Sequence, residues 1–443
     1  MVFHLAILRT FFERKGLTQE ARTGSMWLSN ATSTGERPMT IVHDILKQMP
    51  ALGQPQRKFL ATLFVTILVL RGRVNFRNLS RYCAYSERTI ARQFREPFDW
   101  PDFHQRVLMT ALDPHAELVS AHDASFISKS GKQTFGLGHF FNGCASRAER
   151  GLEMSTLAVV DVTHRCAFTL AVAQTPPGEE ATQDKQDETR VDFYTQQLHA
   201  HRHRLPPGIT YHCVDGYYAK KKYIDAVVSL NLHAITKLRS DADCWFLYPG
   251  PHPKRRGAQR KYDGKVNFQA LSRFEDLGTM EDAPHLHLYT AVVWHKTMKR
   301  RLRIVVLLTQ KDPARPRFIV LGSTDPELNG HKLVELYAAR FQIELLFRDS
   351  KQFTGLLDCQ ARAAAALDFH FNASLATLNL VRAEDLCMQQ GPEPHVFSMA
   401  SWQQCHFNER LLDVFMEKFA LDPTWVKNHA CYDELRTYGA IAA

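Results

Sequence analysis

Five residues in the last third of the chain recur at three- and four-residue steps: Tyr337, Arg340, Glu344, Arg348 and Lys351. On a helix, these steps place side chains along one line of the surface. One carboxylate would then lie among three cations and a phenol. This combination suits a glutamate that binds a metal ion while its neighbours contact phosphates. The same spacing also fits an ordinary solvated helix in which Glu344 pairs with Arg340 and Arg348, and spacing alone does not separate the two interpretations.

The segment Leu333–Lys351 has the composition that a helix carrying this line would need. It contains neither proline nor glycine and is rich in Leu, Ala, Glu and Arg, which favours a helix. Apolar residues fall together on a neighbouring face at helical spacing: Leu336, Ala339, Ile343, Leu346 and Phe347. The sequence therefore predicts one continuous helix that packs on a core by this face.

Two aspartates upstream lie in segments with the composition of strands. Residues 117–127 mix apolar and small residues around Asp123, and a charge inside a strand is costly unless it is paired or binds a cation. Residues 209–215 form a short β-branched run that ends on Asp215. Either aspartate taken singly could instead form a turn or cap a helix.

The motifs around the acids resemble those of insertion-sequence DDE transposases of the IS-four type. Tyr337, Arg340, Glu344 and Lys351 have the order and spacing of the YREK signature of that family. The first DDE motif is matched by Asp123-Ala124-Ser125-Phe126, followed by Lys129, Gly131 and Lys132. Phe341 stands where the family usually has Trp. The resemblance extends from about residue 117 to 355 and includes three acids in the family's order.

This resemblance implies an α/β fold in which an RNase H-like catalytic core is interrupted by a β-rich insertion, with helical N- and C-terminal regions. An insertion also fits the spacing, because Asp215 and Glu344 are further apart in the chain than a bare RNase H-like fold requires. The expected division is a peripheral extension (1–40), a helical and possibly DNA-binding region (41–112), the first part of the core (113–240), the insertion (241–330), the second part of the core (331–390) and a helical C-terminal region (391–443).

The resemblance also implies a reaction. Asp123, Asp215 and Glu344 would hold two Mg²⁺ ions, for which Mn²⁺ can substitute, since carboxylate oxygens are the ligands that Mg²⁺ prefers. Such a site cuts the ends of an insertion sequence and joins the freed 3′-hydroxyls to target DNA by phosphoryl transfer. The expected partners are therefore double-stranded DNA, as inverted-repeat ends and as target, and a second copy of the chain in a homodimeric active complex.

Four cations and a phenol near the acids are candidates for DNA contact. By resemblance, Tyr337, Arg340 and Lys351 hold the phosphates beside the cut, which positions the bond rather than reading sequence. Arg348 lies on the same line of the helix, and Lys129 follows the first aspartate.

Two further regions are candidates for DNA contact. Residues 75–95 predict two short helices, with Ser86 as N-cap of the second, so that Arg88 and Arg92 share a face. This arrangement suits a helix-turn-helix-like reader of DNA ends, or a helical bundle with a solvated basic face. Trp294 is a candidate to stack on an unpaired base, and a core tryptophan is the alternative.

The composition supports an anionic partner. The 443 residues carry a formal net charge of +9 and a pI near 9.0, which favours nucleic acid. Nine scattered cysteines without a CxxC pair indicate neither a disulfide framework nor a zinc site, and they fit a reducing cytoplasm. The resemblance implies that this is the cytoplasm of a bacterium. The longest apolar run, residues 59–70, is too short to cross a membrane.

Two other kinds of protein remain open. One is a metal-dependent DNA endonuclease of the same fold that does not transpose. The other is a DNA-binding protein whose catalytic site has decayed, although the presence of all three acids argues against it.

Overall fold

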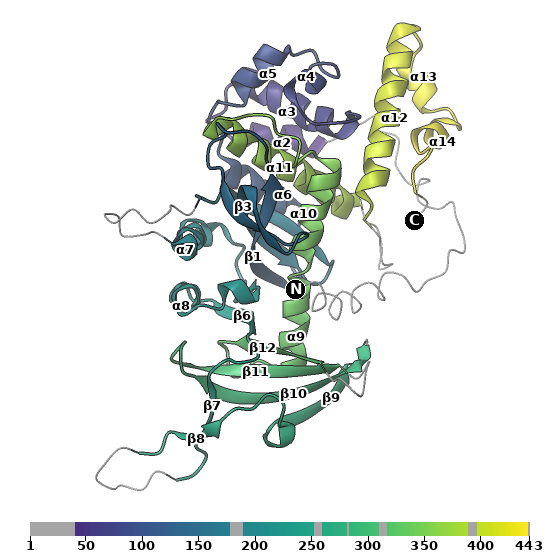
Figure 1. Cartoon of the computed structure of the whole chain (residues 1–443). Helices are drawn as coiled ribbons and strands as arrows, with labels where there is room; N and C mark the ends of the chain where they lie inside the picture. Colours follow the sequence, from purple (N-terminus) through teal and green to yellow (C-terminus); the bar gives the residue numbers. More distant parts are fainter. Residues whose placement is uncertain are drawn as a thin grey trace.

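A computed structural model describes residues 40–177, 189–251, 259–280, 283–309, 317–388 and 397–441 (Figure 1). The expected peripheral extension, residues 1–40, lies outside the described residues except for its last residue. Within the described ranges, no helix combines the length and the apolar character that crossing a bilayer would need.

Helices precede and follow the strands along the chain, and α7 and α8 lie between strands. The helices are α2 (Thr40–Lys47), α3 (Gln54–Val69), α4 (Phe76–Leu79), α5 (Glu87–Gln93), α6 (Trp100–Ala111), α7 (Arg190–His201), α8 (Lys221–Ser229), α9 (Gly330–Ala339), α10 (Gln342–Phe353), α11 (Ala364–Met388), α12 (Met399–Lys418), α13 (Pro423–Lys427) and α14 (Tyr432–Arg436). The strands are β1 (Leu118–Ser128), β2 (Gly138–Asn142), β3 (Arg147–Asp161), β4 (Cys166–Gln174), β5 (Tyr211–Val214), β6 (His233–Leu238), β7 (Cys244–Leu247), β8 (Tyr262–Lys265), β9 (Glu275–Met280), β10 (Ala283–His295), β11 (Arg300–Thr309) and β12 (Arg317–Ser323).

The twelve strands belong to one mixed sheet. Its order is β2-β3-β1-β5-β6-β12-β11-β10-β7-β8, with β4 also paired to β3 and β9 to β10. Strands β1, β5 and β6 run parallel to one another, whereas β1 with β3, β3 with β4, and β6 with β12 are antiparallel. The parallel steps need crossovers, and α7 and α8 provide them.

Helices lie on both faces of the strands that carry the aspartates. On one face, His122 of β1 contacts Gln197 of α7 and Tyr223 of α8. The next residue, Asp123, contacts Arg340 between α9 and α10. Because successive side chains of a strand point to opposite faces, α7 and α8 lie on one side of β1, and the junction of α9 and α10 lies on the other.

The helices α2, α3 and α6 pack against α11 at the end of the molecule opposite β9–β12, and α4 and α5 lie at the same end (Figure 1). Aromatic rings fill this contact: the ring centroids of Phe94 and Phe369 lie 4.4 Å apart, and those of Trp100 and Phe369 5.0 Å apart. The helical pattern of residues 41–112 is therefore present, and Ser86 caps α5 as predicted by accepting the Thr89 N–H.

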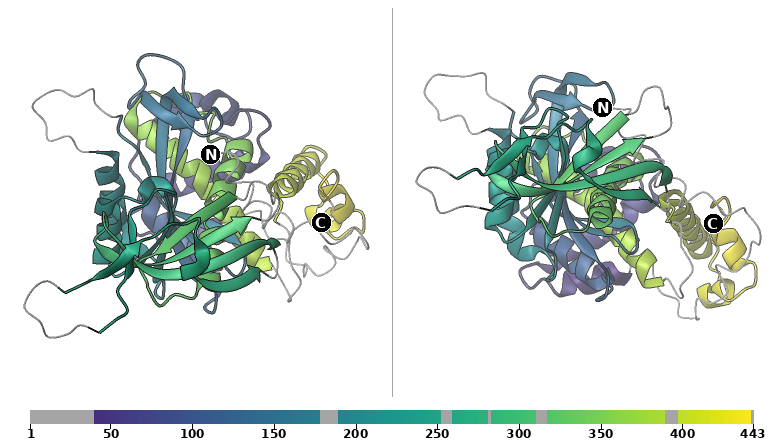
Figure 2. Two further views of the ribbon diagram at one scale, coloured as in Figure 1. Left: turned by 60° about the horizontal axis from the view of Figure 1, so that its bottom comes forward. Right: turned by 90° about the horizontal axis from the view of Figure 1, so that it is seen from below.

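The C-terminal helices form a separate arm. In Figure 2, α12–α14, drawn in yellow, lie beside the rest of the molecule in both views. Helix α12 contacts α3 and α10. The described part of residues 391–443 is thus helical, as predicted.

The single helix predicted for Leu333–Lys351 is wrong. The chain forms α9 and α10, separated by a turn at Arg340 and Phe341. There the N–H of Phe341 donates to Ala338 O, and that of Glu344 donates to Phe341 O. These three-residue steps are those of a 3₁₀ turn, which is narrower and longer per residue than an α-helix. The apolar face nevertheless packs on the core as predicted, with Leu336, Ala339, Ile343, Leu346 and Phe347 all buried.

Residues 241–330, predicted to be rich in strands, contain β7–β12. The longest of these strands are β10, β11 and β12. Strand β12 pairs with β6 from Val320 opposite Leu238 to Ser323 opposite Ile235. These strands therefore continue the sheet that holds the aspartates. Strand β2 and the first half of β3 have no apolar pattern that would predict them, because polar residues interrupt it.

Candidate active site

The strand β1 presents Asp123 near its middle. It lies between β3 and β5, with Asp123 opposite Thr156 of β3. One carboxylate oxygen of Asp123, Oδ1, accepts the N–H of Ala124 at 2.8 Å. The side chain is 19% exposed, so this acid is held in a mostly buried position.

Asp215 follows the last residue of the neighbouring strand. Strand β5 runs parallel to β1, with Val214 beside His122. The next residues, Asp123 and Asp215, therefore emerge side by side. Asp215 Oδ1 accepts the N–H of Tyr217 at 2.8 Å and caps a short 3₁₀ turn. The two strand-borne acids are thus adjacent.

Arg340 connects Asp123 to the third acid. Its guanidinium donates from Nη1 to Asp123 Oδ2 at 3.2 Å and from Nη2 to Glu344 Oε1 at 2.8 Å. Arg340 is only 7% exposed, and its Nε is buried without a hydrogen-bond partner in the part of the chain that the structure describes. The tight turn between α9 and α10 brings this arginine and Glu344 to the face of β1 that carries Asp123.

The charges at this site are not balanced. Burial raises the pKa of Asp123 to about 7; Arg340 lowers it, whereas Asp215 and Glu344 raise it. Burial disfavours the charged form of Arg340, but Tyr337 and the three acids outweigh burial and raise its pKa. Arg340 therefore pairs with two of the three carboxyl groups, and because burial disfavours the charged form of Asp123, further positive charge would be favourable here.

The three carboxyl groups are of a type that binds divalent metal ions, but the guanidinium of Arg340 lies between two of them. Three carboxyl groups supply the hard oxygen ligands that Mg²⁺ prefers. Among the described residues, however, no group of three or more His, Cys, Asp or Glu side chains is placed to hold a metal ion. Arg340 occupies the space between Asp123 and Glu344, and its guanidinium serves as the counter-ion of both.

The other residues of the predicted line differ in exposure. Tyr337 is buried, and burial raises its pKa to about 12. Lys351 is partly buried, and burial lowers its pKa although Asp123 and Cys144 oppose this. Arg348 is exposed and pairs with Asp349 at 2.8 Å. The five residues therefore do not form one solvated stripe, because the first two face the core.

The remaining DNA-binding candidates lie on other elements. Arg88 and Arg92 are exposed on α5, as their predicted shared face requires. Lys129 is partly buried at the end of β1, where its ammonium donates to the carbonyl of Cys359. Trp294 is half-buried on β10 and lies opposite Trp245 of the neighbouring strand β7.

A buried polar network behind Asp123 was not predicted. The Tyr223 hydroxyl lies 2.8 Å from Nδ1 of His122 and 2.9 Å from Nε2 of His212. Nε2 of His122 also lies 2.7 Å from the hydroxyl of Ser155. The network joins β1 to β5 directly below the two aspartates. The polar residues of the Ser-Ala-His-Asp run in an otherwise apolar strand were the available signal.

Lys237 of β6 is a second cation that sequence reasoning missed. Burial lowers its pKa, Asp215 raises it, and Arg340 lowers it further. These influences place its ammonium near the Asp215 side of the site. Its residue type and alternation in a short strand gave no indication of this position.

Comparison with known proteins identifies the family. The model of a family described as DDE superfamily endonuclease matches residues 49–301, more than half of the chain. The match includes Asp123 and Asp215, whereas Glu344 lies beyond it. No curated protein matches the chain. This chain belongs to the DDE superfamily endonuclease family.

Proposed function

We propose that this protein is a DNA transposase of the IS-four type, which cuts insertion-sequence ends and joins them to target DNA. The observation that carries the proposal is the convergence of three acids from distant parts of the chain. Asp123 and Asp215 emerge side by side from parallel strands, and Arg340 joins Glu344 to the first of them. A partly buried cluster of carboxyl groups is costly, and a metal site for DNA cleavage would account for it.

The strand arrangement supports an RNase H-like core. Strands β4, β3 and β1 are antiparallel neighbours, and β1, β5 and β6 continue in parallel. We assign residues 113–240 and 331–390 to this core and residues 241–330 to an insertion between β6 and α9. Residues 41–112 and 391–443 are assigned to helical flanking regions.

The three acids are the proposed metal ligands. Asp123, Asp215 and Glu344 would hold Mg²⁺, or Mn²⁺ in its place, through carboxylate oxygens. When bound, a pair of such ions supplies Lewis-acid activation of the attacking oxygen and stabilises the leaving oxygen. The raised pKa of Asp123 supports this assignment, because the site favours more positive charge than Arg340 alone provides.

Arg340 has a proposed role in both the free and the DNA-bound protein. In the free protein, it neutralises Asp123 and Glu344. A guanidinium also binds phosphate well, since its planar donors match phosphate oxygens. We therefore infer that Arg340 transfers from the carboxylates to a phosphate beside the cut when DNA binds. The centroid of the Tyr337 ring lies 5.7 Å from Cζ of Arg340, so the ring supports the guanidinium. In this proposal, Lys351 contacts a neighbouring phosphate.

Further contacts would hold the rest of the DNA. Arg88 and Arg92 present an exposed basic face on α5, and Arg348 is exposed on α10. Lys129 follows β1, the strand that carries Asp123, and Trp294 offers a partly exposed ring. The proposed substrates are double-stranded inverted-repeat ends and target DNA, bound by a homodimer.

A DNA endonuclease that cuts without joining is the second candidate. It is favoured by the description of the matched family, which names an endonuclease. The two candidates differ in one product, because only a transposase connects the cut 3′ end to a second duplex.

One assay separates these candidates and tests the acids. Purified protein is incubated with Mg²⁺, a labelled duplex carrying the inverted repeat that flanks its coding region, and a supercoiled target plasmid. We expect labelled ends to be cut and then joined to the plasmid. Cutting without joining would support the endonuclease instead.

The same assay with Asp123→Asn, Asp215→Asn or Glu344→Gln tests the catalytic assignment. Each change removes an anionic ligand and should reduce cleavage by about a thousandfold or more, equivalent to several kcal/mol. DNA binding in a gel-shift assay should change little. Glu96→Gln, at an exposed acid on the helical region, is the matched control. If one of the three variants cleaved DNA at the rate of the unmodified protein, the acid replaced in that variant would not belong to the catalytic site.

A further inference from the structure

The buried polar network behind Asp123 runs through side chains that are each at most 7% exposed. They come from five elements: Ser120 and His122 of β1, Ser155 of β3, Gln197 of α7, His212 of β5 and Tyr223 of α8. Tyr223 lies at the centre, because its hydroxyl is within hydrogen-bond distance of both imidazoles. The network therefore connects β1, β3 and β5 with the two helices that lie on the face of β1 opposite Asp123.

The side-chain amide of Gln197 fixes the direction of the hydrogen bonds in this network. Its Nε2 lies 3.3 Å from the carbonyl oxygen of Ser155 and 3.4 Å from that of Ala171, so Oε1 is the atom that faces the network. Because Oε1 can only accept, the Ser155 hydroxyl, which lies 2.6 Å away, donates to it. Nε2 of His122 lies 2.7 Å from the same hydroxyl and must therefore carry the proton of this ring.

The other hydrogen bonds of the network follow from this end. With its proton on Nε2, His122 accepts the Tyr223 hydroxyl at Nδ1, and the Tyr223 oxygen accepts the Nε2 proton of His212. Nδ1 of His212 then accepts the hydroxyl of Ser120 at 2.8 Å. Burial lowers the pKa of both imidazoles, so each ring carries the single proton that this order requires. Every hydrogen bond from Ser120 to Gln197 therefore has one donor and one acceptor.

The two strands that precede the aspartates share a short backbone register. Strand β1 pairs with β3 over its whole length of 11 residues, whereas its register with β5 covers residues 120–122. A shift of one residue in such a register turns a side chain to the opposite face of the sheet, and Asp215 would then leave the face that carries the other aspartate. The network adds side-chain connections at this point, because His212 contacts β1 directly and again through Tyr223.

We propose that Tyr223 and His212 are positioning residues for the metal ligands and hold β1 and β5 in the register that brings Asp123 and Asp215 side by side. A fully paired buried network favours a single arrangement of its members, and Mg²⁺ requires ligands in nearly ideal octahedral positions. The Tyr223 hydroxyl lies on the face of β1 opposite Asp123, so its effect reaches the metal site through the strands. This inference rests on the proposed function, because it assigns the same acids to a metal site.

Calorimetric titration of Mn²⁺ into the full chain without DNA tests the proposal. Tyr223→Phe removes one hydroxyl and leaves both imidazoles without their common partner. We expect this variant to bind Mn²⁺ about tenfold more weakly, as is typical when a group that supports a metal ligand is lost. The matched control is Tyr194→Phe, which removes a similarly buried hydroxyl that donates to Glu153 of β3 at 2.5 Å. This control should leave the affinity for Mn²⁺ unchanged.

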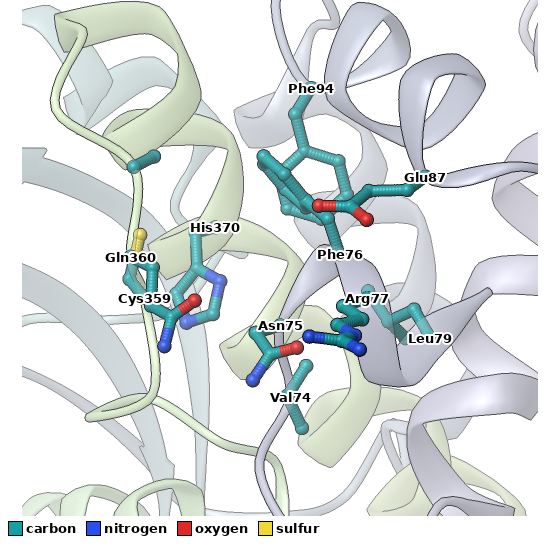
Figure 3. Close-up of a pocket in the computed structure, with 11 residues that line it drawn as sticks. Val74, Asn75, Phe76, Arg77, Leu79, Glu87, Phe94, Cys359, Gln360 and His370 are labelled. Atoms are coloured by element: carbon teal, nitrogen blue, oxygen red, sulfur yellow. The ribbon is translucent and has the colours of Figure 1, made fainter. Parts of the chain in front are cut away.

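A second variant keeps the test independent of how Tyr223→Phe folds. In His212→Gln, the amide nitrogen can still donate to Tyr223, but the bond from Ser120 is lost. We expect the affinity for Mn²⁺ to fall, but less than in Tyr223→Phe. The matched control is His370→Gln on α11. Nε2 of His370 lies 2.9 Å from the carbonyl oxygen of Gly355, and its ring lines a cavity of about 40 Å³ beside residues 74–77 (Figure 3). If Tyr223→Phe does not fold, the comparison of these two histidine variants decides the question.

The measured affinity separates positioning from a loss of stability, because partial unfolding reduces the number of sites and leaves the affinity of the folded molecules unchanged. Circular dichroism at the temperature of the titration gives the folded fraction. An equal affinity of Tyr223→Phe and the unmodified protein would overturn the proposal, and so would equal losses in Tyr223→Phe and Tyr194→Phe.

A failure of the proposed function gives a different result. If the unmodified protein binds Mn²⁺ but does not cut DNA, a weaker affinity in Tyr223→Phe would still support positioning, whereas the proposed transposase activity would be wrong. Mn²⁺ binding that is unchanged in Asp123→Asn would overturn both the positioning role and the assignment of the metal ligands.

Discussion

At the scale of single residues, Arg340 determines the electrostatic state of the candidate site. It is buried and pairs with carboxylates from β1 and from α10. A buried cation of this kind compensates charges that would otherwise make the fold unstable. The interpretation of Glu344 as a member of an ion-paired helix is therefore correct for its contact with Arg340. It is compatible with a catalytic role, because the same acids can exchange one cation for another.

Replacing Arg340 should expose this exchange. In Arg340→Gln, Asp123 and Glu344 lose their common counter-ion, so the thermal unfolding temperature without metal should fall. Mg²⁺ no longer competes with the guanidinium and should bind about tenfold more tightly. This gain corresponds to about 1.4 kcal/mol of additional stabilisation at saturating Mg²⁺.

Thermal unfolding with and without Mg²⁺ and calorimetric titration of Mg²⁺ check this prediction. Arg95→Gln, at an exposed position beyond α5, is the control. If Mg²⁺ raised the unfolding temperature equally in Arg340→Gln and the unmodified protein, metal and arginine would not compete for the acids.

Lys351 should act through a phosphate and not through the metal. Lys351→Ala should weaken binding of the DNA end and reduce the slope of log affinity against log salt by about one. Some Mg²⁺-dependent nicking should persist when protein and DNA are in excess. Binding titrations at several salt concentrations measure the slope, with Lys418→Ala, at an exposed position on α12, as control. An unchanged slope would make Lys351 a structural residue.

At the scale of elements, features defined by a local residue pattern were predictable from the sequence, whereas features that depend on tertiary contacts were not. The strands that carry Asp123 and Asp215 were predictable because residue type and alternation define them locally. The break after α9 was not, because Arg340 pairs with Asp123 more than two hundred residues away in the chain. The burial of Arg340 escaped prediction for the same reason, since charged residues on an amphipathic helix ordinarily face water.

The contact of α11 with α12 contains a buried acid with a measurable consequence. Glu384 is 7% exposed, and its Oε1 has no hydrogen-bond partner among the described residues. Burial and then Glu409 raise its pKa to about 8. Between about pH 4.5 and 8, the carboxyl group of Glu384 keeps its proton in the folded state and has lost it in the unfolded state. The free energy of unfolding should therefore fall as pH rises from about 4.5 to 8.

Glu384→Gln should remove this dependence. Relative to the unmodified protein, the variant should gain about 1–3 kcal/mol of stability between pH 5 and pH 8, because no buried carboxylate has to form. Urea unfolding at both pH values measures the difference. Glu417→Gln, at an exposed acid on α12, should show no such gain. Equal gains for the two variants would contradict the assignment.

At the scale of the whole molecule, basic groups lie far from the acids as well as beside them. Helix α5 presents Arg88 and Arg92 at the end of the molecule opposite β9–β12 (Figure 1). If DNA extends from the acids to this helix, Arg88→Ala/Arg92→Ala should lower affinity for DNA ends and reduce the salt slope by about two. Cleavage of a short substrate limited to the cut site should be unaffected.

Titration of long and short duplexes at several salt concentrations tests this extended contact. The matched control is Arg410→Ala/Lys418→Ala, at exposed positions on α12. Equal affinity of the α5 variant and the unmodified protein for the long duplex would favour the alternative of a solvated bundle face.

The pairing of β12 with β6 has a consequence for how such a protein can diversify. The chain leaves the neighbourhood of the acids at Leu238 and returns at Val320, its direct partner across the sheet. The two points of an antiparallel pair are only about 5 Å apart, so the length of the excursion between them does not set the spacing of the strands. Additions or losses at the outer strands β7 and β8 leave β10–β12, on which α9 packs, in place. A lineage can therefore remodel this outer edge through successive mutations while the geometry of the three acids is inherited unchanged.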